Sequence, residues 1–157
     1  AGDGVILSGV FKGFEDLMAL GFADRMPTIC MVQAEGSQAI SRALEKGSFT
    51  DPVSAKTIAD SISVDVPSAG YFAVDLLKRH GGRAVIVSDE EILAAQRRLA
   101  STTGLFSEPA AAAAAAGFFS IRHELPDDAT VVLLITGSGL KDVDSAKKGV
   151  GLSCAVP

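Results

Sequence analysis

Three residues at the start of the chain have the types and spacing of an anion-binding turn. Gly2, Asp3 and Gly4 precede an amphipathic stretch, residues 10–20, that predicts a helix. Unpaired backbone amides at a helix N-terminus and the positive end of the helix dipole both favour a negatively charged group. The glycine spacing fits neither the dinucleotide fingerprint G-x-G-x-x-G nor a P-loop. The turn therefore predicts a site for one phosphate group, with the Ser8 hydroxyl as an additional donor.

Asp3 is the unfavourable residue in this turn. A carboxylate beside a phosphate repels it, because both groups are negatively charged. We therefore expect Asp3 to be compatible with a bound phosphate only if its side chain points away from the turn.

Two later positions could also face a ligand. Glu108 comes directly before Pro109 and the alanine run 110–116, which predicts a helix because alanine has the best helix propensity and proline is tolerated in a first turn. A carboxylate at that helix start either stabilises the helix dipole or faces a ligand. Thr136 opens a glycine-rich turn after a predicted strand, and open α/β sheets bind ligands beyond the carboxyl ends of their parallel strands.

The elements that position these residues alternate along the chain. Short runs of β-branched and apolar residues predict strands buried on both faces, and the intervening amphipathic stretches predict helices. Ser88 and Glu91 have the spacing of a capping box at the start of one helix. The predicted strands are residues 28–32, 83–87 and 130–135, the later helices are 36–44, 71–79, 88–103 and 110–116, and residues 47–67 form an excursion. This order predicts an α/β fold, an open and mostly parallel sheet with helices on both faces.

Composition limits the possible functions. The chain has 157 residues, 48% of them hydrophobic, and a net charge of -5, which together indicate one globular domain. Nucleic-acid binding as the main function would need a clustered basic face, and the only adjacent arginines, Arg97 and Arg98, lie in a helix of mixed charge. No apolar run is long enough to predict a membrane span. We therefore expect neither nucleic acid nor membrane as a partner.

Cysteine and histidine give no metal or disulfide pattern. Cys30 and Cys154 are far apart and lie in no C-x-x-C motif, so we expect no metal site and a reducing, cytoplasmic location. Cys30 falls inside an apolar run, which predicts a small buried side chain. His80 and His123 are solitary and are expected at helix ends or on the surface rather than as catalytic bases.

Taken together and in order, the motifs resemble those of the threonine synthase family of fold type II pyridoxal-phosphate enzymes. The resemblance runs from Gly2 to Asp142, and serine/threonine dehydratases and cysteate synthase share parts of it. It implies that residues 1–142 are the C-terminal part of the large domain of a tryptophan synthase β-like fold, followed by a tail, 143–157. The segments that carry the resemblance are residues 2–4 with 12–14, 32–36, 57–62, 87–92, 106–110 and 136–142.

The resemblance also implies a cofactor, pyridoxal phosphate, and residues that hold it. The family's phosphate loop falls on Gly2, Asp3 and Gly4, where Asp3 departs from the more usual glycine or asparagine. The family's hydroxyl at the pyridine nitrogen falls on Thr136, and a neutral partner there suits elimination and replacement chemistry. Glu108 matches a Glu-Pro-Ala element near the cofactor.

One part of the family pattern is absent. The Schiff-base lysine lies in a Ser-x-Lys-Asp-Arg-like segment upstream of the glycine loop, and this sequence contains no such segment, so no catalytic residue is assigned. We therefore expect the chain to be a C-terminal portion whose N-terminal part is missing, and to be inactive alone. The lysines without the family context are Lys12, Lys46, Lys56, Lys78, Lys141, Lys147 and Lys148.

By resemblance, the intact enzyme converts O-phosphohomoserine and water to threonine and phosphate. The alternatives are another β-eliminating or β-replacing enzyme of fold type II, or an α/β binding or oligomerisation module without catalysis. In the enzyme hypotheses the partner is a small amino-acid substrate and the protein is a homo-oligomer, expected to be a dimer. A strand missing beside the glycine loop would leave an exposed sheet edge, which favours self-association.

Overall fold

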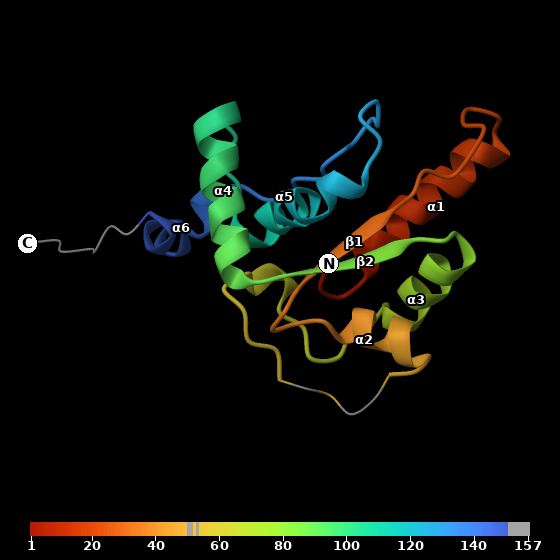
Figure 1. Ribbon diagram of the computed structural model, residues 1–157. Helices are drawn as coiled ribbons and strands as arrows, with labels where there is room; N and C mark the ends of the chain where they lie inside the picture. The colour runs from red at the N-terminus through yellow and green to blue at the C-terminus, as the bar shows by residue number, and fades with distance from the viewer. Residues whose placement is uncertain (50–51, 53, 151–157) are drawn as a thin grey trace, which may run out of the picture.

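A small parallel sheet lies at the centre of the structure, with helices on both sides (Figure 1). The computed structural model describes residues 1–49, 52 and 54–150. The elements in chain order are α1 (Val5–Ala19), β1 (Cys30–Ala34), α2 (Ala39–Lys46), the 3-10 helix η1 (Asp60–Ile62), α3 (Gly70–Arg79), β2 (Arg83–Val87), α4 (Asp89–Thr103), α5 (Pro109–Ile121), the 3-10 helices η2 (Arg122–Glu124) and η3 (Gly139–Lys141), and α6 (Val143–Gly149).

The two strands pair in parallel, with Cys30 opposite Arg83 and Ala34 opposite Val87. The predicted strand 83–87 is confirmed with the same bounds, and the first strand begins two residues later than predicted. Parallel strands need a crossover connection, and α2 and α3 lie in the one that joins β1 to β2. The prediction of a parallel sheet in an α/β fold is therefore confirmed.

Successive side chains of each strand point to opposite faces of the sheet, so one strand serves two cores. Ala34 from β1 and both Val85 and Val87 from β2 belong to a core that they share with α4, α5 and η1. Met31 and Ala84 point the other way, into a core with α1, α2 and α3. The helices on both faces that the sequence predicted are thus present.

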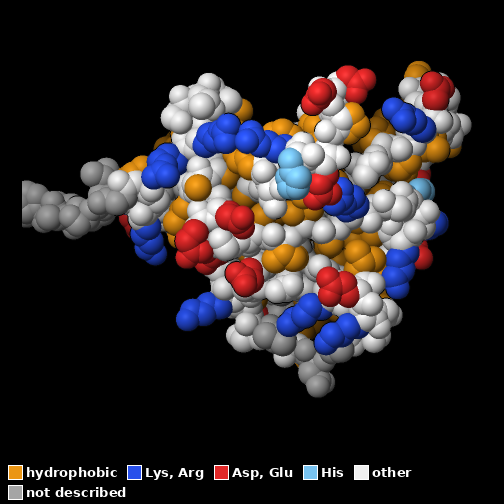
Figure 2. Space-filling view, viewed as in Figure 1, with side chains coloured by type: hydrophobic (Ala, Val, Ile, Leu, Met, Phe, Trp, Pro, Cys, Tyr) orange, Lys and Arg blue, Asp and Glu red, His pale blue; other side chains and the backbone are white. Residues whose placement is uncertain are grey.

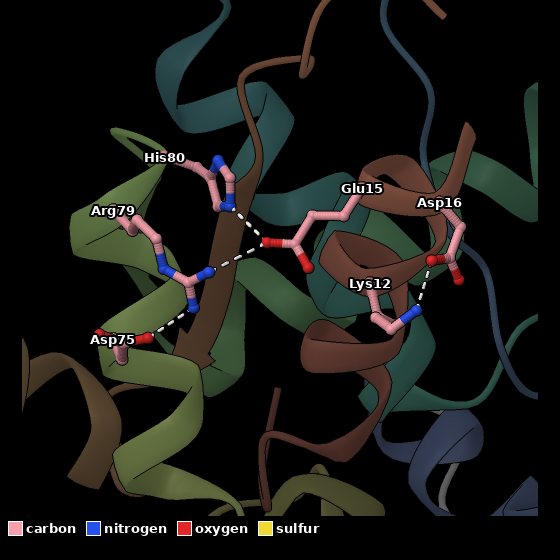
Figure 3. Close-up of polar contacts among 6 residues, drawn as sticks. All are labelled: Lys12, Glu15, Asp16, Asp75, Arg79 and His80. Carbon is pink, nitrogen blue, oxygen red and sulfur yellow. Dashed lines mark hydrogen bonds and ion pairs between the residues drawn. The ribbon is translucent and has the colours of Figure 1, made fainter. Parts of the chain in front are cut away.

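The second core holds α1 in place. Phe11 is fully buried, as is Leu76 of α3, and burying a side chain of this size stabilises the fold by roughly 1.5–3 kcal/mol. His80 follows the last residue of α3, stacks on Phe11 and lies 2.9 Å from the Glu15 carboxylate (Figure 3). Arg79 reaches the same carboxylate at 3.2 Å. His80 is therefore a helix-end residue, as predicted, and it helps to join α1 to α3.

The alanine-rich helix α5 packs closely on the sheet. Five of its alanines are buried, and a methyl group added at Gly117 would lie 2.4 Å from the Val32 side chain on β1. Small side chains therefore allow the helix axis to approach the strand. The predicted helix is confirmed and continues to Ile121. The predicted capping box of α4 is also confirmed, because the Ser88 hydroxyl accepts from the Glu91 amide while the Glu91 carboxylate accepts from the Ser88 amide.

The predicted third strand is wrong in the part of the chain that the structure describes. Residues 130–135 form no ladder there, although their side chains alternate as in a strand: Leu133 and Ile135 pack against the core of α4 and α5, whereas Val132 is exposed. Alternation alone predicts an extended segment, but a strand also requires a neighbouring strand with which to hydrogen-bond.

Two other predictions need correction. Cys30 is exposed rather than buried, because it is the first residue of β1 and lies opposite Arg83 at the exposed amino end of the strand pair. Helix α1 begins at Val5, five residues before the predicted start, because Gly4 rather than Gly9 makes the turn into the helix. Among the described residues, none of the helices has both the length and the apolar character needed to cross a bilayer.

Candidate functional site

The glycine turn at the start of the chain lies directly before a helix of 15 residues. Gly4 is the N-cap of α1 and has φ 90°, a left-handed conformation that glycine adopts without the steric cost that other residues incur. The amides of Val5 and Ile6 stand in the first helical turn, and no acceptor among the described residues contacts them. Gly2 lies against the backbone of Ile62, where a methyl group would come within 2.8 Å of the Ile62 Cα atom. The turn therefore has the unpaired donors and the close backbone approach that a phosphate site needs.

The Asp3 carboxylate is held by the segment that leads into α3. One oxygen accepts a hydrogen bond from the Ser68 amide at 2.6 Å, and the other accepts one from the Ser68 hydroxyl, also at 2.6 Å. These bonds to the Ser68 hydroxyl and amide lower the pKa of Asp3, because they favour the charged carboxylate. The Asp3 carbonyl accepts a further bond from the Ala69 amide at 3.2 Å. The side chain is therefore engaged at the entry to α3, which is the condition under which the sequence allowed a phosphate nearby.

Ser8 does not belong to the turn. Because α1 begins at Val5, Ser8 lies on the buried side of the helix, 6% exposed, and its hydroxyl has no hydrogen-bond partner among the described residues. The suggestion that Ser8 donates to a phosphate is not supported by this placement.

The 3-10 helix η1 connects the glycine turn to Glu108. Ile62 of η1 contacts Gly2, and the Ser61 hydroxyl of the same turn donates to Glu108 at 3.4 Å. The buried Ser37 hydroxyl fixes the end of η1 by donating to the Ile62 carbonyl at 2.9 Å. The segment between the two predicted parts of the site is thus itself part of it.

The other end of this segment is fixed on α4. Asp89, the first residue of α4, accepts from the Ile58 amide at 2.9 Å and from the Thr57 hydroxyl. Asp89 follows the carboxyl end of β2, and Ser37 lies three residues beyond the carboxyl end of β1. Residues 57–62 therefore cross the carboxyl ends of both parallel strands, which is where open α/β sheets bind ligands.

Glu108 is a buried carboxylate, 6% exposed. It precedes α5 as the N-cap, but its side chain does not cap that helix. Instead, Oε2 lies 3.4 Å from the ammonium of Lys141 and accepts from Ser61. A buried carboxylate is costly unless a cation and hydrogen bonds compensate for its charge, and Lys141 supplies the cation. The interpretation of Glu108 as a helix-capping group is therefore disfavoured relative to a role within the site.

Thr136 reaches the site through its neighbour in the chain. The Glu108 amide donates to the Gly137 carbonyl at 3.0 Å, and a methyl group on Gly137 would lie 2.0 Å from a Glu108 carboxylate oxygen. Thr136 itself is exposed. The structure thus brings Gly2, Glu108 and Thr136 into one continuous strip, in which η1 joins the glycine turn to the turn at residues 136–139.

Sequence reasoning missed Ser37, Ser61, Ser68 and Asp89. Each of them contacts a partner between 25 and 65 positions away in the chain. Local spacing reveals caps and turns but carries no signal for such distant pairs. The one available signal was the quoted segment 57–62, to which the sequence analysis assigned no individual roles.

The part of the chain that the structure describes contains no cluster of histidine, cysteine, aspartate and glutamate able to hold a metal ion. The strip is instead lined by backbone amides, hydroxyl groups and the ion pair of the buried Glu108 carboxylate with Lys141. This donor set suits an organic anion with a polar ring rather than a cation. Figure 2 shows one face of the molecule, on which basic and acidic side chains are interspersed rather than gathered into one basic patch.

Comparison with protein families gives a match over most of the chain. The family described as pyridoxal-phosphate dependent enzyme matches residues 1–137. A threonine synthase from Methanocaldococcus jannaschii is 36% identical over 147 residues, which are 89% of this chain and 36% of that protein. A threonine synthase from Methanosarcina acetivorans is 37% identical over 80 residues, which are 50% of this chain and 20% of that protein. The chain thus spans well under half the length of these relatives.

Solved structures have the same fold. A fungal L-serine ammonia-lyase from Rhizomucor miehei matches with a TM-score of 0.75 and 27% identity, over 94% of this chain and 47% of that one. A bacterial-type threonine deaminase, from T.th., matches with a TM-score of 0.71 and 25% identity, over 88% of this chain and 47% of that one. The threonine synthase from Escherichia coli has a TM-score of 0.65 at 20% identity, over 90% of this chain and 33% of that one, and that likeness concerns the fold alone.

Proposed function

Because the chain belongs to the family of pyridoxal-phosphate dependent enzymes, we propose that it forms the cofactor-binding part of a threonine synthase-like enzyme. The observation that carries this proposal is the continuous strip across the carboxyl ends of β1 and β2. It joins a phosphate-sized glycine turn at Gly2–Gly4 to a polar turn at Thr136 through η1.

The residues of the strip fit the cofactor. In the proposal, the amides after Gly4 hold the phosphate, while Thr136 faces the pyridine nitrogen and Glu108 lines the ring end. The left-handed Gly4 supports the first assignment, because it turns the chain so that the unpaired amides of α1 stand at its start. When bound, pyridoxal phosphate supplies an electron sink for the carbon that loses its proton, and a hydroxyl partner on the ring nitrogen tempers that sink.

The reaction proposed for the whole protein is that of threonine synthase. It converts O-phosphohomoserine and water to threonine and phosphate. The support is the identity of 36–37% to two archaeal threonine synthases, one of them along 89% of this chain. The small amino-acid substrate and a homodimeric assembly belong to the same proposal.

A second candidate is deamination of serine or threonine. It is favoured by the structural neighbours, since the L-serine ammonia-lyase and the threonine deaminase match with TM-scores of 0.75 and 0.71, above the 0.65 of the Escherichia coli threonine synthase. Both candidates use the same cofactor and the same strip. They differ in the substrate group that leaves.

The chain by itself is proposed to be inactive. Of the lysines in the described part of the chain, only Lys141 contacts the strip through its side chain, and its ammonium pairs with Glu108. Lys12 pairs with Asp16 on the exposed side of α1. A Schiff base to the cofactor would therefore come from a lysine outside these 157 residues.

The test uses the full-length protein that carries this sequence. We expect it to show the visible absorption band of lysine-bound pyridoxal phosphate and to release inorganic phosphate from O-phosphohomoserine together with threonine. Formation of a 2-oxo acid from serine or threonine, without phosphate release from O-phosphohomoserine, would select the second candidate. Absence of the absorption band after incubation with the cofactor would contradict both.

A further inference from the structure

Asp3 is the one residue of the glycine turn whose side chain departs from the family pattern, and the structure gives that side chain a specific partner. We propose that Asp3 is a positioning residue that shapes the phosphate turn by binding Ser68 at the entry to α3. This inference rests on the proposed function, because the turn it shapes is the proposed phosphate site.

The contacts form a compact clasp between two segments 65 positions apart in the chain. Both Asp3 carboxylate oxygens accept from Ser68, at 2.6 Å from the amide and 2.6 Å from the hydroxyl. The Asp3 carbonyl accepts from the Ala69 amide at 3.2 Å. Asp3 therefore makes three hydrogen bonds to two consecutive residues before α3.

Gly4 rests on the same helix. A methyl group at Gly4 would lie 3.1 Å from the Ala73 side chain and 3.2 Å from the Ala69 carbonyl, so this part of the turn lies directly on α3. The clasp at Asp3 and the contact at Gly4 fix two consecutive residues against one helix. Because Gly4 is the N-cap of α1, fixing them also fixes the direction in which the first amides of α1 point.

The clasp also explains how a carboxylate can occupy a phosphate loop. Charge-assisted hydrogen bonds hold the carboxylate at Ser68, so its oxygens are directed toward α3. The positive end of the α3 dipole adds to this preference, because Ser68 lies just before the helix. Asp3 then contributes to the site through the backbone shape that it enforces, while its side chain makes no contact with the phosphate.

This role makes a prediction that simple charge repulsion reverses. If repulsion dominates, Asp3→Asn removes the charge and tightens cofactor binding. If positioning dominates, Asp3→Asn stays close to wild type, since an amide can accept from the Ser68 amide and donate to its hydroxyl. Asp3→Ala removes the clasp and weakens binding.

The experiment compares binding of pyridoxal phosphate and of pyridoxal, which lacks the phosphate, to the full-length protein by absorbance titration. We expect Asp3→Ala to raise the Kd for pyridoxal phosphate roughly tenfold, since hydrogen bonds to a charged group are lost. The Kd for pyridoxal should stay the same within about twofold, because pyridoxal does not use the turn. Ser68→Ala should shift the ratio of the two constants in the same direction, and the double variant should be no weaker than Asp3→Ala.

Asp16→Ala is the matched control. Asp16 is an aspartate on the exposed side of α1, paired with Lys12 and outside the strip (Figure 3). It should leave both dissociation constants unchanged. Thermal unfolding of each variant reports separately whether the protein is folded, and Ser68→Ala keeps the test usable if Asp3→Ala does not fold.

Two results would overturn the inference while leaving the proposed function intact. One is equal weakening of pyridoxal phosphate and pyridoxal binding by Asp3→Ala and Ser68→Ala. The other is tighter binding of pyridoxal phosphate by Asp3→Asn than by wild type. Failure of the wild-type protein to bind pyridoxal phosphate at all would instead contradict the proposed function.

Discussion

Two glycines of the same helical segment are predicted to respond to alanine in opposite directions. Gly4 has φ 90° and Gly9 lies in the second turn of α1, where a methyl group would have nothing within 4 Å. The same chemical change, the addition of one methyl group, therefore tests backbone conformation at one position and helix propensity at the other.

The magnitude follows from the geometry. A residue with a side chain in the left-handed region costs about 1–2 kcal/mol. The methyl group of Gly4→Ala also meets three atoms, of Ala73, Ala69 and Ile40, at 3.1–3.3 Å, and this tight packing adds up to about 1 kcal/mol. Gly9→Ala gains about 1 kcal/mol, because alanine is the better helix former at an exposed position. The two variants should thus differ by about 3–4 kcal/mol in free energy of unfolding.

The assay is urea denaturation followed by circular dichroism, carried out on the full-length protein with and without pyridoxal phosphate. Gly4→Ala should lower the free energy of unfolding and lose most of the stabilisation that the cofactor gives to the wild-type protein. Gly9→Ala should raise the free energy of unfolding and keep that stabilisation. The reasoning is refuted if Gly4→Ala is as stable as wild type, or if the two variants bind the cofactor equally well.

Three further predictions concern other parts of the structure. Gly117→Ala should destabilise the protein by about 1–3 kcal/mol in denaturation experiments, because the methyl group would overlap Val32; an unchanged midpoint would contradict the close packing of α5. Lys141→Met should reduce cofactor binding more than the double variant Lys141→Met/Glu108→Gln does, because the single change leaves a buried carboxylate without its cation; equal loss in the two variants would speak against the pair. The pKa of Asp142 is lowered mainly by its hydrogen bond to the hydroxyl of the α6 residue that it caps, so its contribution to stability is present above the ordinary aspartate pKa and lost as pH falls through the folded-state value. A nuclear magnetic resonance titration of Asp142 should therefore give a midpoint below that of an exposed aspartate, and a midpoint at the ordinary value would exclude the cap.

Local features of the fold could be predicted from the sequence. The strand 83–87 and the capping box of Ser88 and Glu91 depend on neighbouring residues, and both are confirmed. The alanine-rich helix follows from propensity alone, and it is also present. Features that depend on distant partners were predicted less well. Residues 130–135 have the alternation of a strand but no ladder among the described residues, and Cys30 is exposed because of its place at the end of the sheet.

The candidate site divides in the same way. Gly2, Gly4, Glu108 and Thr136 could be selected because glycine turns and a Glu-Pro-Ala element are local patterns. Their connection through η1 could not be predicted, since the hydroxyl of Ser61 meets Glu108 across 47 positions of the chain. The role of Asp3 was likewise stated only as a condition, and its contact with Ser68 supplies the reason that the condition is met.

The most direct test of the account is a crystal structure of the full-length protein with pyridoxal phosphate bound. We predict that the phosphate lies at the amides that follow Gly4 and that the pyridine nitrogen faces Thr136, with the Asp3 carboxylate still bound to Ser68. A phosphate held elsewhere in the protein, or a ring nitrogen turned away from Thr136, would contradict the assignment of this strip as the cofactor site.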